Sequence, residues 1–228
     1  EGLDFSQVIT FNLEEYFGLA SDALQSYHRW MHEHFFRHVN VPQENIHIPQ
    51  GAVPLDAIDA HCREYEQEIE RAGGIDILLL GIGSNGHIGF NEPFSQRGGR
   101  TRLCVLDPAT RRSAASDFFS EANVPQQAIT IGVGTIFDAR KIRLLAWGEH
   151  KADIIRETTE GPVSPRVPAS YLQEHSDATV IVDAAAGQSL TATVTPWALG
   201  KVEPPDALLN RACICRPQKT AKAPPQPT

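Results

Sequence analysis

The segment Ile75–Leu80 (IDILLL) constrains the fold more than any other stretch of the sequence. It is a short and mostly apolar run, with Gly73-Gly74 before it and Gly81 after it. A run of this length bounded by glycines is typical of a strand that is buried on both faces of a parallel sheet. We therefore expect a parallel sheet that is packed against other elements on both sides.

Strands and helices are expected to alternate along the rest of the chain. Apolar residues recur at helical spacing after Ser21-Asp22, which would cap a helix, and from Asp56 to Ala72. This alternation predicts an α/β fold with an open, mainly parallel Rossmann-like sheet and helices on both faces. Further strands are expected at residues 7–13, 101–106, 128–133, 141–147 and 179–182, and further helices at 109–119 and 151–159.

The length of 228 residues, with 41% hydrophobic side chains, suits one large domain with a substantial core. We expect this domain to cover residues 1–195. Residues 196–228 are interrupted by prolines and end in the polar run RPQKTAKAPPQPT, so a disordered extension is expected there.

The charge balance and the apolar runs exclude two classes of partner. The 20 basic and 28 acidic side chains give a net charge of −8, which disfavours nucleic acid but still permits a small anionic substrate. The longest apolar run is less than half of a bilayer span, so no membrane partner is expected. The first ten residues show no signal peptide. The four cysteines are irregularly spaced, which favours reduced thiols in a cytoplasmic protein.

The glycines Gly81, Gly83 and Gly86 spell G-x-G-x-x-G, a pattern that also occurs in dinucleotide-binding proteins. That fingerprint requires a helix directly after the last glycine. Residues 87–93 and the following Gly98-Gly99 leave no room for one. A nicotinamide-binding module therefore remains a less favoured alternative.

A second interpretation of the same loop concerns His87 and Glu92. Both would lie at the carboxyl end of a central strand, where open α/β sheets bind ligands. Histidine can take and give a proton near neutral pH, and a nearby carboxylate can fix its tautomer. A second acidic strand end, Glu14-Glu15, could join this site.

The loop GIGSNGHIGFNEP closely resembles the G-x-G-x-D-G-H-I-A-F-N-E-P signature of glucosamine-6-phosphate deaminases. The segment VITFNLEEYFGL is similar to their F-N-x-D-E-Y-x-G-L segment, and the resemblance extends from about residue 7 to residue 182. Related phosphogluconolactonases share the fold but continue differently after the Gly-His pair. The resemblance therefore points to the deaminase branch of the glucosamine-6-phosphate deaminase/6-phosphogluconolactonase family.

The resemblance implies a reaction and roles for several residues. The pyranose ring of an amino sugar phosphate opens, a proton moves from C2 to C1, and the resulting imine is hydrolysed to fructose 6-phosphate and ammonia. By resemblance, His87 protonates the ring oxygen, Glu92 orients His87, and Glu14 removes the C2 proton. Lys151 would contact the phosphate, and Gly86 would let the sugar approach the backbone. Proton transfers of this kind require no metal or organic cofactor.

Three positions depart from the family pattern. Glu14 stands where the deaminases usually have Asp, which moves the carboxylate outward by one methylene. Asn85 stands where the signature has Asp, so a charge beside His87 is lost. Asp117 stands where the family has an arginine before its Phe-Phe pair, and Asp repels a phosphate. Arg111 and Arg112 are the candidates to replace that arginine.

Three further expectations follow from the same resemblance. The family's glycine- and threonine-rich phosphate loop and first strand are expected upstream of Glu1. The protein would act on a sugar phosphate, and a homo-oligomer is compatible with the sequence. The alternative is a catalytically impaired sugar-phosphate-binding or regulatory domain of the same fold.

Four histidines form i, i+4 pairs that could bind zinc but lack a carboxylate or Cys in ligand register, so no metal site is expected: His28, His32, His34 and His38.

Overall fold

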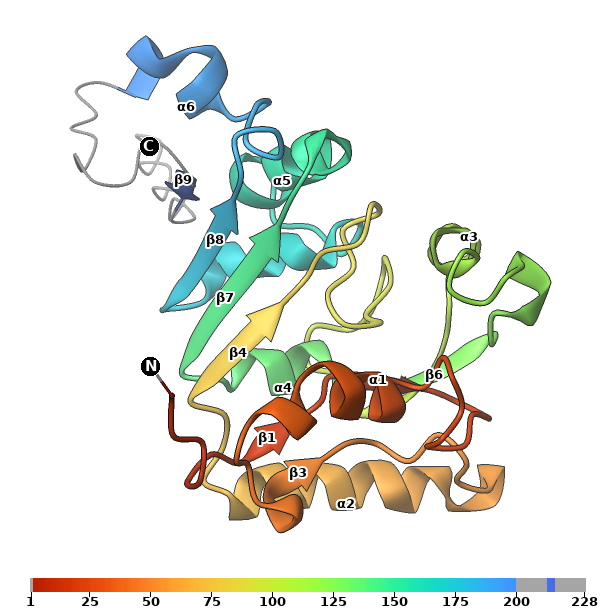
Figure 1. Cartoon of the computed structure of the whole chain (residues 1–228). Coiled ribbons are helices and arrows are strands. Elements are labelled where there is room, and N and C mark those ends of the chain that lie inside the picture. The colour runs from red at the N-terminus through yellow and green to blue at the C-terminus, as the bar shows by residue number, and fades with distance from the viewer. Residues whose placement is uncertain (1, 200–212, 216–228) are drawn as a thin grey trace, which may run out of the picture.

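The computed structural model describes residues 2–199 and 213–215 of the chain. Its centre is a sheet in which three neighbouring strands run parallel (Figure 1). In sheet order its strands are β4 (Ile77–Leu80), β7 (Lys141–Ala146), β8 (Ala178–Val182) and β9 (Cys213–Cys215), of which β9 is antiparallel to β8.

Two smaller sheets flank the central one. One is the parallel pair β1 (Thr10–Phe11) and β3 (Ile46–His47). The other is antiparallel, in the order β2 (Glu14–Tyr16), β6 (Gln127–Thr130), β5 (Arg102–Val105). The expected α/β fold with mainly parallel strands is confirmed.

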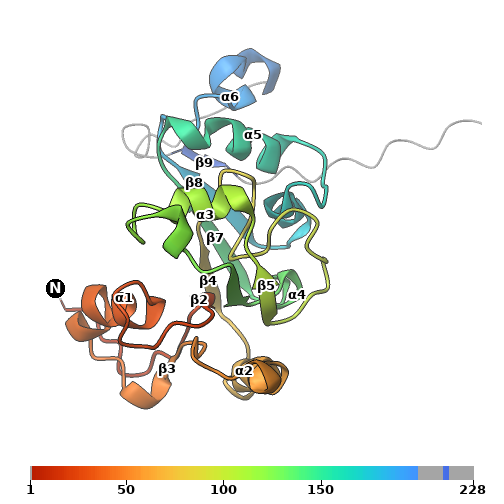
Figure 2. The same ribbon diagram turned by 90° about the vertical axis from the view of Figure 1, so that its right-hand side faces the viewer.

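The helices are spread along the molecule, with α3 and α4 between its two ends (Figure 2). Two of them, α1 and α2, lie with β3 at one end, and α5 and α6 lie at the other. The α-helices are α1 (Tyr27–His34), α2 (Ile58–Arg71), α3 (Pro108–Ala114), α4 (Val133–Phe137), α5 (Ala152–Glu160) and α6 (Thr191–Val194). Short 3₁₀ segments are η1 (Phe36–His38), η2 (Gln43–Asn45), η3 (Leu55–Ala57), η4 (Glu121–Asn123), η5 (Glu149–Lys151), η6 (Pro168–Glu174) and η7 (Pro196–Leu199).

The first helix begins later than the sequence predicts. Ser26, rather than Ser21 or Asp22, is its N-cap, and the Ser26 side chain accepts a hydrogen bond from the backbone N–H of Arg29. A second acceptor at this helix end is the buried carboxylate of Glu15, a residue 12 positions before the helix starts. This contact depends on tertiary structure, so helical spacing alone could not place the start.

Other element limits also shift. The helix expected at 109–119 ends at Ala114. Phe119 has a φ of +62°, which is incompatible with a right-handed helix. The helix starts at Pro108 because Asp107 caps it by accepting from the backbone N–H of Ala109. The strand expected at 128–133 ends at Thr130, because α4 begins at Val133.

The main hydrophobic core lies on one face of the central sheet. Leu78 and Leu80 of β4 are only 4% and 1% exposed. They belong to the same core cluster as Ile155 of α5 and Leu172 of η6, which pack on this face (Figure 1). This packing therefore fixes the orientation of β4 and the point at which the strand ends.

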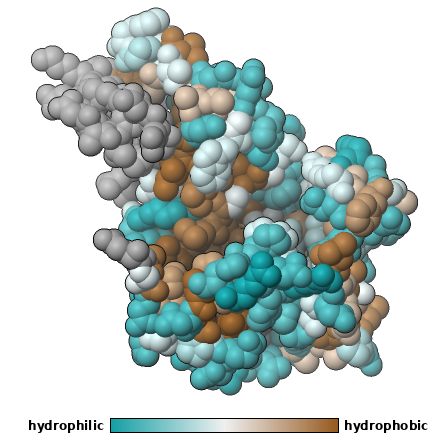
Figure 3. Space-filling model, viewed as in Figure 1, coloured by the Kyte–Doolittle hydropathy of each residue, from teal (hydrophilic) through white to brown (hydrophobic). Residues whose placement is uncertain are grey.

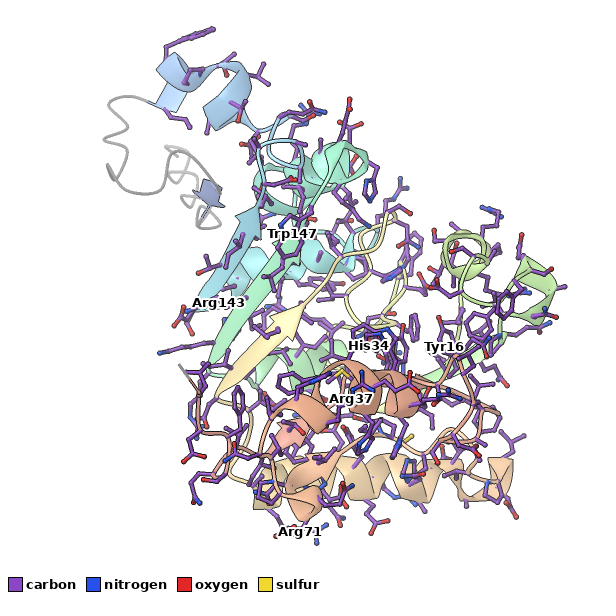
Figure 4. All side chains as sticks on the ribbon, viewed as in Figure 1. Tyr16, His34, Arg37, Arg71, Arg143 and Trp147 are labelled. Atoms are coloured by element: carbon purple, nitrogen blue, oxygen red, sulfur yellow. The ribbon has the colours of Figure 1, made fainter. Side chains whose placement is uncertain are left out.

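The opposite face of the central sheet differs from the prediction that β4 is buried on both faces. Ile77 and Leu79, which alternate with the buried leucines of β4, are 61% and 62% exposed, so this strand is not buried on both faces. Trp147, directly after β7, is 56% exposed, and Figure 4 places it with Arg143 along that strand. Figure 3 shows the apolar surface over this region. No helix of residues 2–199 covers it.

Two observations concern the ends and the helices of the chain. Of the extension 196–228, the structure describes only η7 and β9, and the expected disorder of the other residues lies outside the described part. Within residues 2–199 and 213–215, every helix is too short or too polar to span a bilayer.

Candidate active site

The strand β2 sends its two acidic side chains in opposite directions, as the alternation of a strand requires. The Glu15 carboxylate accepts hydrogen bonds from the backbone N–H groups of Tyr16, Tyr27 and His28, at 2.8, 3.0 and 2.9 Å. Glu15 therefore anchors α1. Tyr16 lies between α1 and the segment after α3 (Figure 4), stacked on Tyr27 and edge-on to Phe118. Only Glu14 of the acidic pair remains for chemistry.

Glu14 is a carboxyl group in an environment that disfavours its charge. Its Oε2 atom is shut off from solvent and has no hydrogen-bond partner among the described residues. Burial raises the pKa of Glu14 to about 7, and the neighbouring His87 only partly opposes this effect. A carboxyl group with such a pKa can accept and return a proton near neutral pH.

The loop after β4 is shaped around the imidazole of His87. A β-carbon at Gly83 would lie 2.2 Å from Cε1 of His87, so only glycine fits under the ring. The backbone N–H of Gly83 donates to the His87 carbonyl at 3.0 Å. Gly86 has a φ of +83°, in the left-handed region that favours glycine. The glycines therefore fold the loop back on itself and hold His87 at the end of β4.

One nitrogen of the His87 ring is engaged by the protein. Nδ1 lies 3.3 Å from Oε2 of Glu92 and 3.2 Å from Oγ1 of Thr110. Both partners contact the same nitrogen, which leaves Nε2 for another ligand. The predicted pairing of His87 with Glu92 is therefore present, and Nε2 is the ring atom able to exchange a proton with a substrate.

Glu92 is held as an anion. Its Oε2 accepts from the side-chain amide of Asn85 at 2.8 Å, and its Oε1 accepts from the backbone N–H of Asp107 at 3.1 Å. Burial acts to raise its pKa, but the hydrogen bonds from His87, Thr110 and Asn85 outweigh burial and lower the pKa to about 2. Asn85 thus supports the charge of Glu92 instead of supplying a charge of its own.

Asn91 fixes the position of the loop that carries His87 and Glu92. Its side chain is fully buried, and its Nδ2 donates to the carbonyls of Ile88 and Ile131 at 2.9 and 2.8 Å. Its Oδ1 accepts from Nη1 of Arg102 at 2.9 Å. The loop is therefore tied to the end of β6 and to β5, and Arg102 contributes to the architecture of the site.

Lys151 lies at the same edge of the sheet. Its Nζ donates to the carbonyl of Ile82 at 2.8 Å, one residue before the glycine that packs under His87. Burial lowers the pKa of Lys151. The ammonium group of Lys151 therefore lies beside the loop at the end of β4, and its predicted contact with a phosphate stays a prediction.

The other expected phosphate contacts, Arg111 and Arg112, follow Thr110 on α3, and the Thr110 hydroxyl contacts His87. Arg111 donates through Nη2 to the carbonyl of Glu121 at 3.2 Å, within its own segment. Arg112 and Asp117 are exposed. The Nε atom of Arg111 is buried and has no hydrogen-bond partner among the described residues, so the predicted contact of Arg111 and Arg112 with a phosphate stays a prediction.

The alternative uses of these motifs find no support in the described residues. No helix begins directly after Gly86, because the next element is the strand β5, whereas a dinucleotide fingerprint needs a helix there. The histidines of α1 form no group of three or more metal-ligating side chains in the described part of the chain. His28 and His32 lie close together, with ring centroids 5.1 Å apart, as successive turns of one helix require.

Sequence reasoning missed three contributors to the site: Thr110, Asp107 and Asn91. The Asp107-Pro108 pair is a helix-start signal, which could have placed Thr110 inside the first turns of α3. Nothing local to the sequence indicates that α3 packs its Thr110 hydroxyl against His87, because residues 87 and 110 belong to separate elements.

Comparisons with known proteins identify the family to which the chain belongs. The family model for glucosamine-6-phosphate isomerases/6-phosphogluconolactonase matches residues 1–181. A glucosamine-6-phosphate deaminase-like protein of Bacteroides thetaiotaomicron is 46% identical over 222 residues, which make up 97% of this chain and 34% of that protein. The chain therefore spans about a third of the length of this relative. The glucosamine-6-phosphate deaminase of Thermoanaerobacter sp. is 49% identical over 181 residues, which are 79% of this chain and 71% of that protein.

Solved structures agree with this placement. A monomeric glucosamine-6-phosphate deaminase superposes with a TM-score of 0.79 at 44% identity, covering 82% of this chain and 77% of that one. The 6-phosphogluconolactonase of Thermotoga maritima superposes with a TM-score of 0.61 at 20% identity, covering 79% and 74%, and shows the shared fold alone. The chain belongs to the glucosamine-6-phosphate isomerase/6-phosphogluconolactonase family.

Proposed function

We propose that this chain carries a glucosamine-6-phosphate deaminase-type site, which converts an amino sugar phosphate to fructose 6-phosphate and ammonia. The observation that carries the proposal is the Glu14 carboxyl group, whose pKa of about 7 and unpartnered Oε2 suit a proton-transfer base beside His87. The relatives named glucosamine-6-phosphate deaminase, at 49% and 44% identity, support the choice of substrate.

The proposed reaction begins with opening of the sugar ring. Nε2 of His87 delivers a proton to the ring oxygen as the bond between that oxygen and C1 breaks, and the neutral His87 then takes the proton of the hydroxyl on C1 to give the aldehyde. Glu92 holds the imidazole through Nδ1, so that the free nitrogen points to the substrate. Because Glu92 remains an anion, it also stabilises the positive charge that His87 carries before it gives up its proton.

The second stage is the transfer of a proton from C2 to C1. Glu14 removes the C2 proton, the electron pair forms the C1–C2 double bond, and His87 returns its proton to the oxygen on C1, which gives an enolamine. The protonated Glu14 then returns a proton to C1, which leaves an imine at C2. Water adds to this imine and ammonia departs, leaving the ketone of fructose 6-phosphate. Each step is a proton transfer or the addition of water, and Glu14 needs a pKa near the working pH because it both accepts and donates.

Lys151 is the proposed contact to the phosphate. Its Nζ lies beside the loop of His87, where the ammonium group can meet an oxyanion as a point charge.

The proposal also includes a cytoplasmic location and a role as a hydrolase of amino sugar metabolism. The free thiols Cys62 and Cys104 agree with that location.

A second candidate function is sugar-phosphate binding without turnover. It is favoured by the engagement of Arg111 with the Glu121 carbonyl and by the exposed Asp117, whose charge would repel a phosphate. A bound sugar phosphate held by few cations would turn over poorly, because orientation is what accelerates proton transfer.

The test is incubation of the protein with glucosamine 6-phosphate, followed by measurement of ammonia and fructose 6-phosphate. The expected result is equimolar release of both, abolished by His87→Gln and retained by His34→Gln, which changes an exposed histidine of α1. Calorimetric binding of glucosamine 6-phosphate without any release of ammonia would favour the second candidate. Product formation that survives His87→Gln would contradict the mechanism.

A further inference from the structure

Gly89 lies in the loop between His87 and Glu92, against the carboxylate of Glu14. Its φ is +54°, and it has no side chain to separate the loop from β2. A β-carbon at this position would lie 3.1 Å from Oε2 of Glu14 and 3.0 Å from Oγ1 of Thr130. Such distances are tighter than nearly all contacts of real β-carbons, so one of these neighbours would have to shift by a few tenths of an ångström.

Thr130 is the neighbour that cannot move easily. It is completely buried in β6, directly opposite Glu14 in the antiparallel register. Its Oγ1 accepts from the backbone N–H of Phe90 at 3.1 Å and donates to the carbonyl of Ile131 at 3.2 Å. Oε2 of Glu14 has no such hydrogen bond among the described residues. A side chain at residue 89 would therefore displace the Glu14 carboxylate.

We propose that Gly89 is a positioning residue for Glu14. Because Gly89 has no methyl group, the longer acid of this chain can occupy that space. The loop signature that this chain resembles has Ala where the chain has Gly89, and the accompanying segment has Asp where the chain has Glu14. Glu is longer than Asp by one methylene, and Ala is larger than Gly by one methyl. The two differences offset each other in volume at the point where residues 14 and 89 meet.

The consequence for chemistry rests on the proposed function, whereas the packing of the pair does not. With Glu at position 14 and Gly at position 89, the carboxylate reaches the loop of His87 without being pushed aside. The replacement of Asp by Glu at position 14 is then compensated by Gly89 and does not destroy the site. Displacement of about 1 Å at a reacting group can cost roughly a hundredfold in rate, so even a partial displacement is measurable.

The test is a double-mutant cycle with Gly89→Ala and Glu14→Asp in the 228-residue protein. Urea unfolding of the four proteins gives the change in the unfolding equilibrium constant that Gly89→Ala causes in each background. We expect this change to be larger in the wild-type background than in the Glu14→Asp background by about twofold or more, the lower limit of coupling between contacting residues. The same cycle in kcat/KM for glucosamine 6-phosphate should show that Gly89→Ala is more harmful when Glu14 is intact than when it is shortened by Glu14→Asp.

Gly73→Ala is the matched control. Gly73 also has a positive φ, of +88°, but a β-carbon there would meet nothing within 4 Å. Its effect on unfolding should therefore be the same in the wild-type and Glu14→Asp backgrounds.

The outcomes separate the pair from the proposed function. Equal effects of Gly89→Ala in the two backgrounds would overturn the pairing. If Gly89→Ala does not fold, folding of the Glu14→Asp/Gly89→Ala protein supports the pairing, and its failure to fold overturns it. If the wild-type protein releases no ammonia, the proposed function fails while the unfolding cycle still decides whether residues 14 and 89 are coupled.

Discussion

Replacing Glu14 with Gln should make the protein more stable above pH 7, although it removes the proposed base. Burial raises the pKa of Glu14 from its usual 4.5 to about 7, so the folded protein holds a proton that the unfolded chain has already released. The stability contributed by this protonated carboxyl is complete below pH 4.5 and is lost as the pH rises through 7. Gln carries no such proton and avoids this loss.

The magnitude follows from the difference between the two pKa values. From 4.5 to about 7, at about 1.4 kcal/mol per pH unit, the free energy of unfolding should fall by up to about 3 kcal/mol in the wild-type protein. Glu14 keeps some exposed surface, so about 3 kcal/mol is an upper limit. The free energy of unfolding of Glu14→Gln, relative to wild type, should rise by that amount between pH 4.5 and pH 8.

The assay is urea unfolding of wild type and Glu14→Gln at half-unit steps from pH 4.5 to pH 8.5. Glu157→Gln, which changes an exposed carboxylate of α5, is the matched control, and its difference from wild type should vary little with pH. A Glu14→Gln difference that stays constant over this range would refute the reasoning, because it would mean that the folded and unfolded states release the Glu14 proton at the same pH.

Two further predictions concern the loop after β4. Gly83→Ala should lower kcat/KM of the proposed deamination by about a hundredfold, because its β-carbon would displace the His87 ring. Gly81→Ala, with no neighbour within 4 Å, should have little effect, and equal losses in the two variants would contradict the close packing. Asn85→Asp should raise the pKa of Glu92 above about 2, because it replaces the amide donor at 2.8 Å with a second carboxylate. Carbon-detected NMR titration of Glu92 measures this change, and an unaltered pKa would show that Asn85 does not support the Glu92 charge.

The sequence predicted those parts of the fold that depend on local patterns. The run around Ile77–Leu80, the helix at Ile58–Arg71 and the strand at Lys141–Ala146 lie where apolar spacing and glycine stops placed them. The start of α1 was misplaced, because Glu15 supplies part of its cap from a distant strand. The open face beside Leu79 was also missed, since an apolar strand has the same composition whether or not another element covers it.

The candidate site could be predicted where one short segment carries it. His87 and Glu92 lie five residues apart in one glycine-rich loop, so their contact required little tertiary information. The role of Asn85 depends on the hydrogen bond from its amide to Glu92, a contact that residue type alone does not reveal. The environment of Glu14 required the structure entirely, because burial and the approach of Gly89 arise from the packing of β2 against a loop 75 residues away.

The central claim is that Glu14 carries a proton between two carbons of an amino sugar phosphate beside His87. The most direct measurement is proton NMR of the products after incubation with glucosamine 6-phosphate in deuterium oxide. The wild-type protein should yield fructose 6-phosphate with deuterium at C1, because an acid that equilibrates with solvent returns the proton. Glu14→Gln should yield neither product nor exchange at C2. Deuterium incorporation by Glu14→Gln at the wild-type rate would contradict the account.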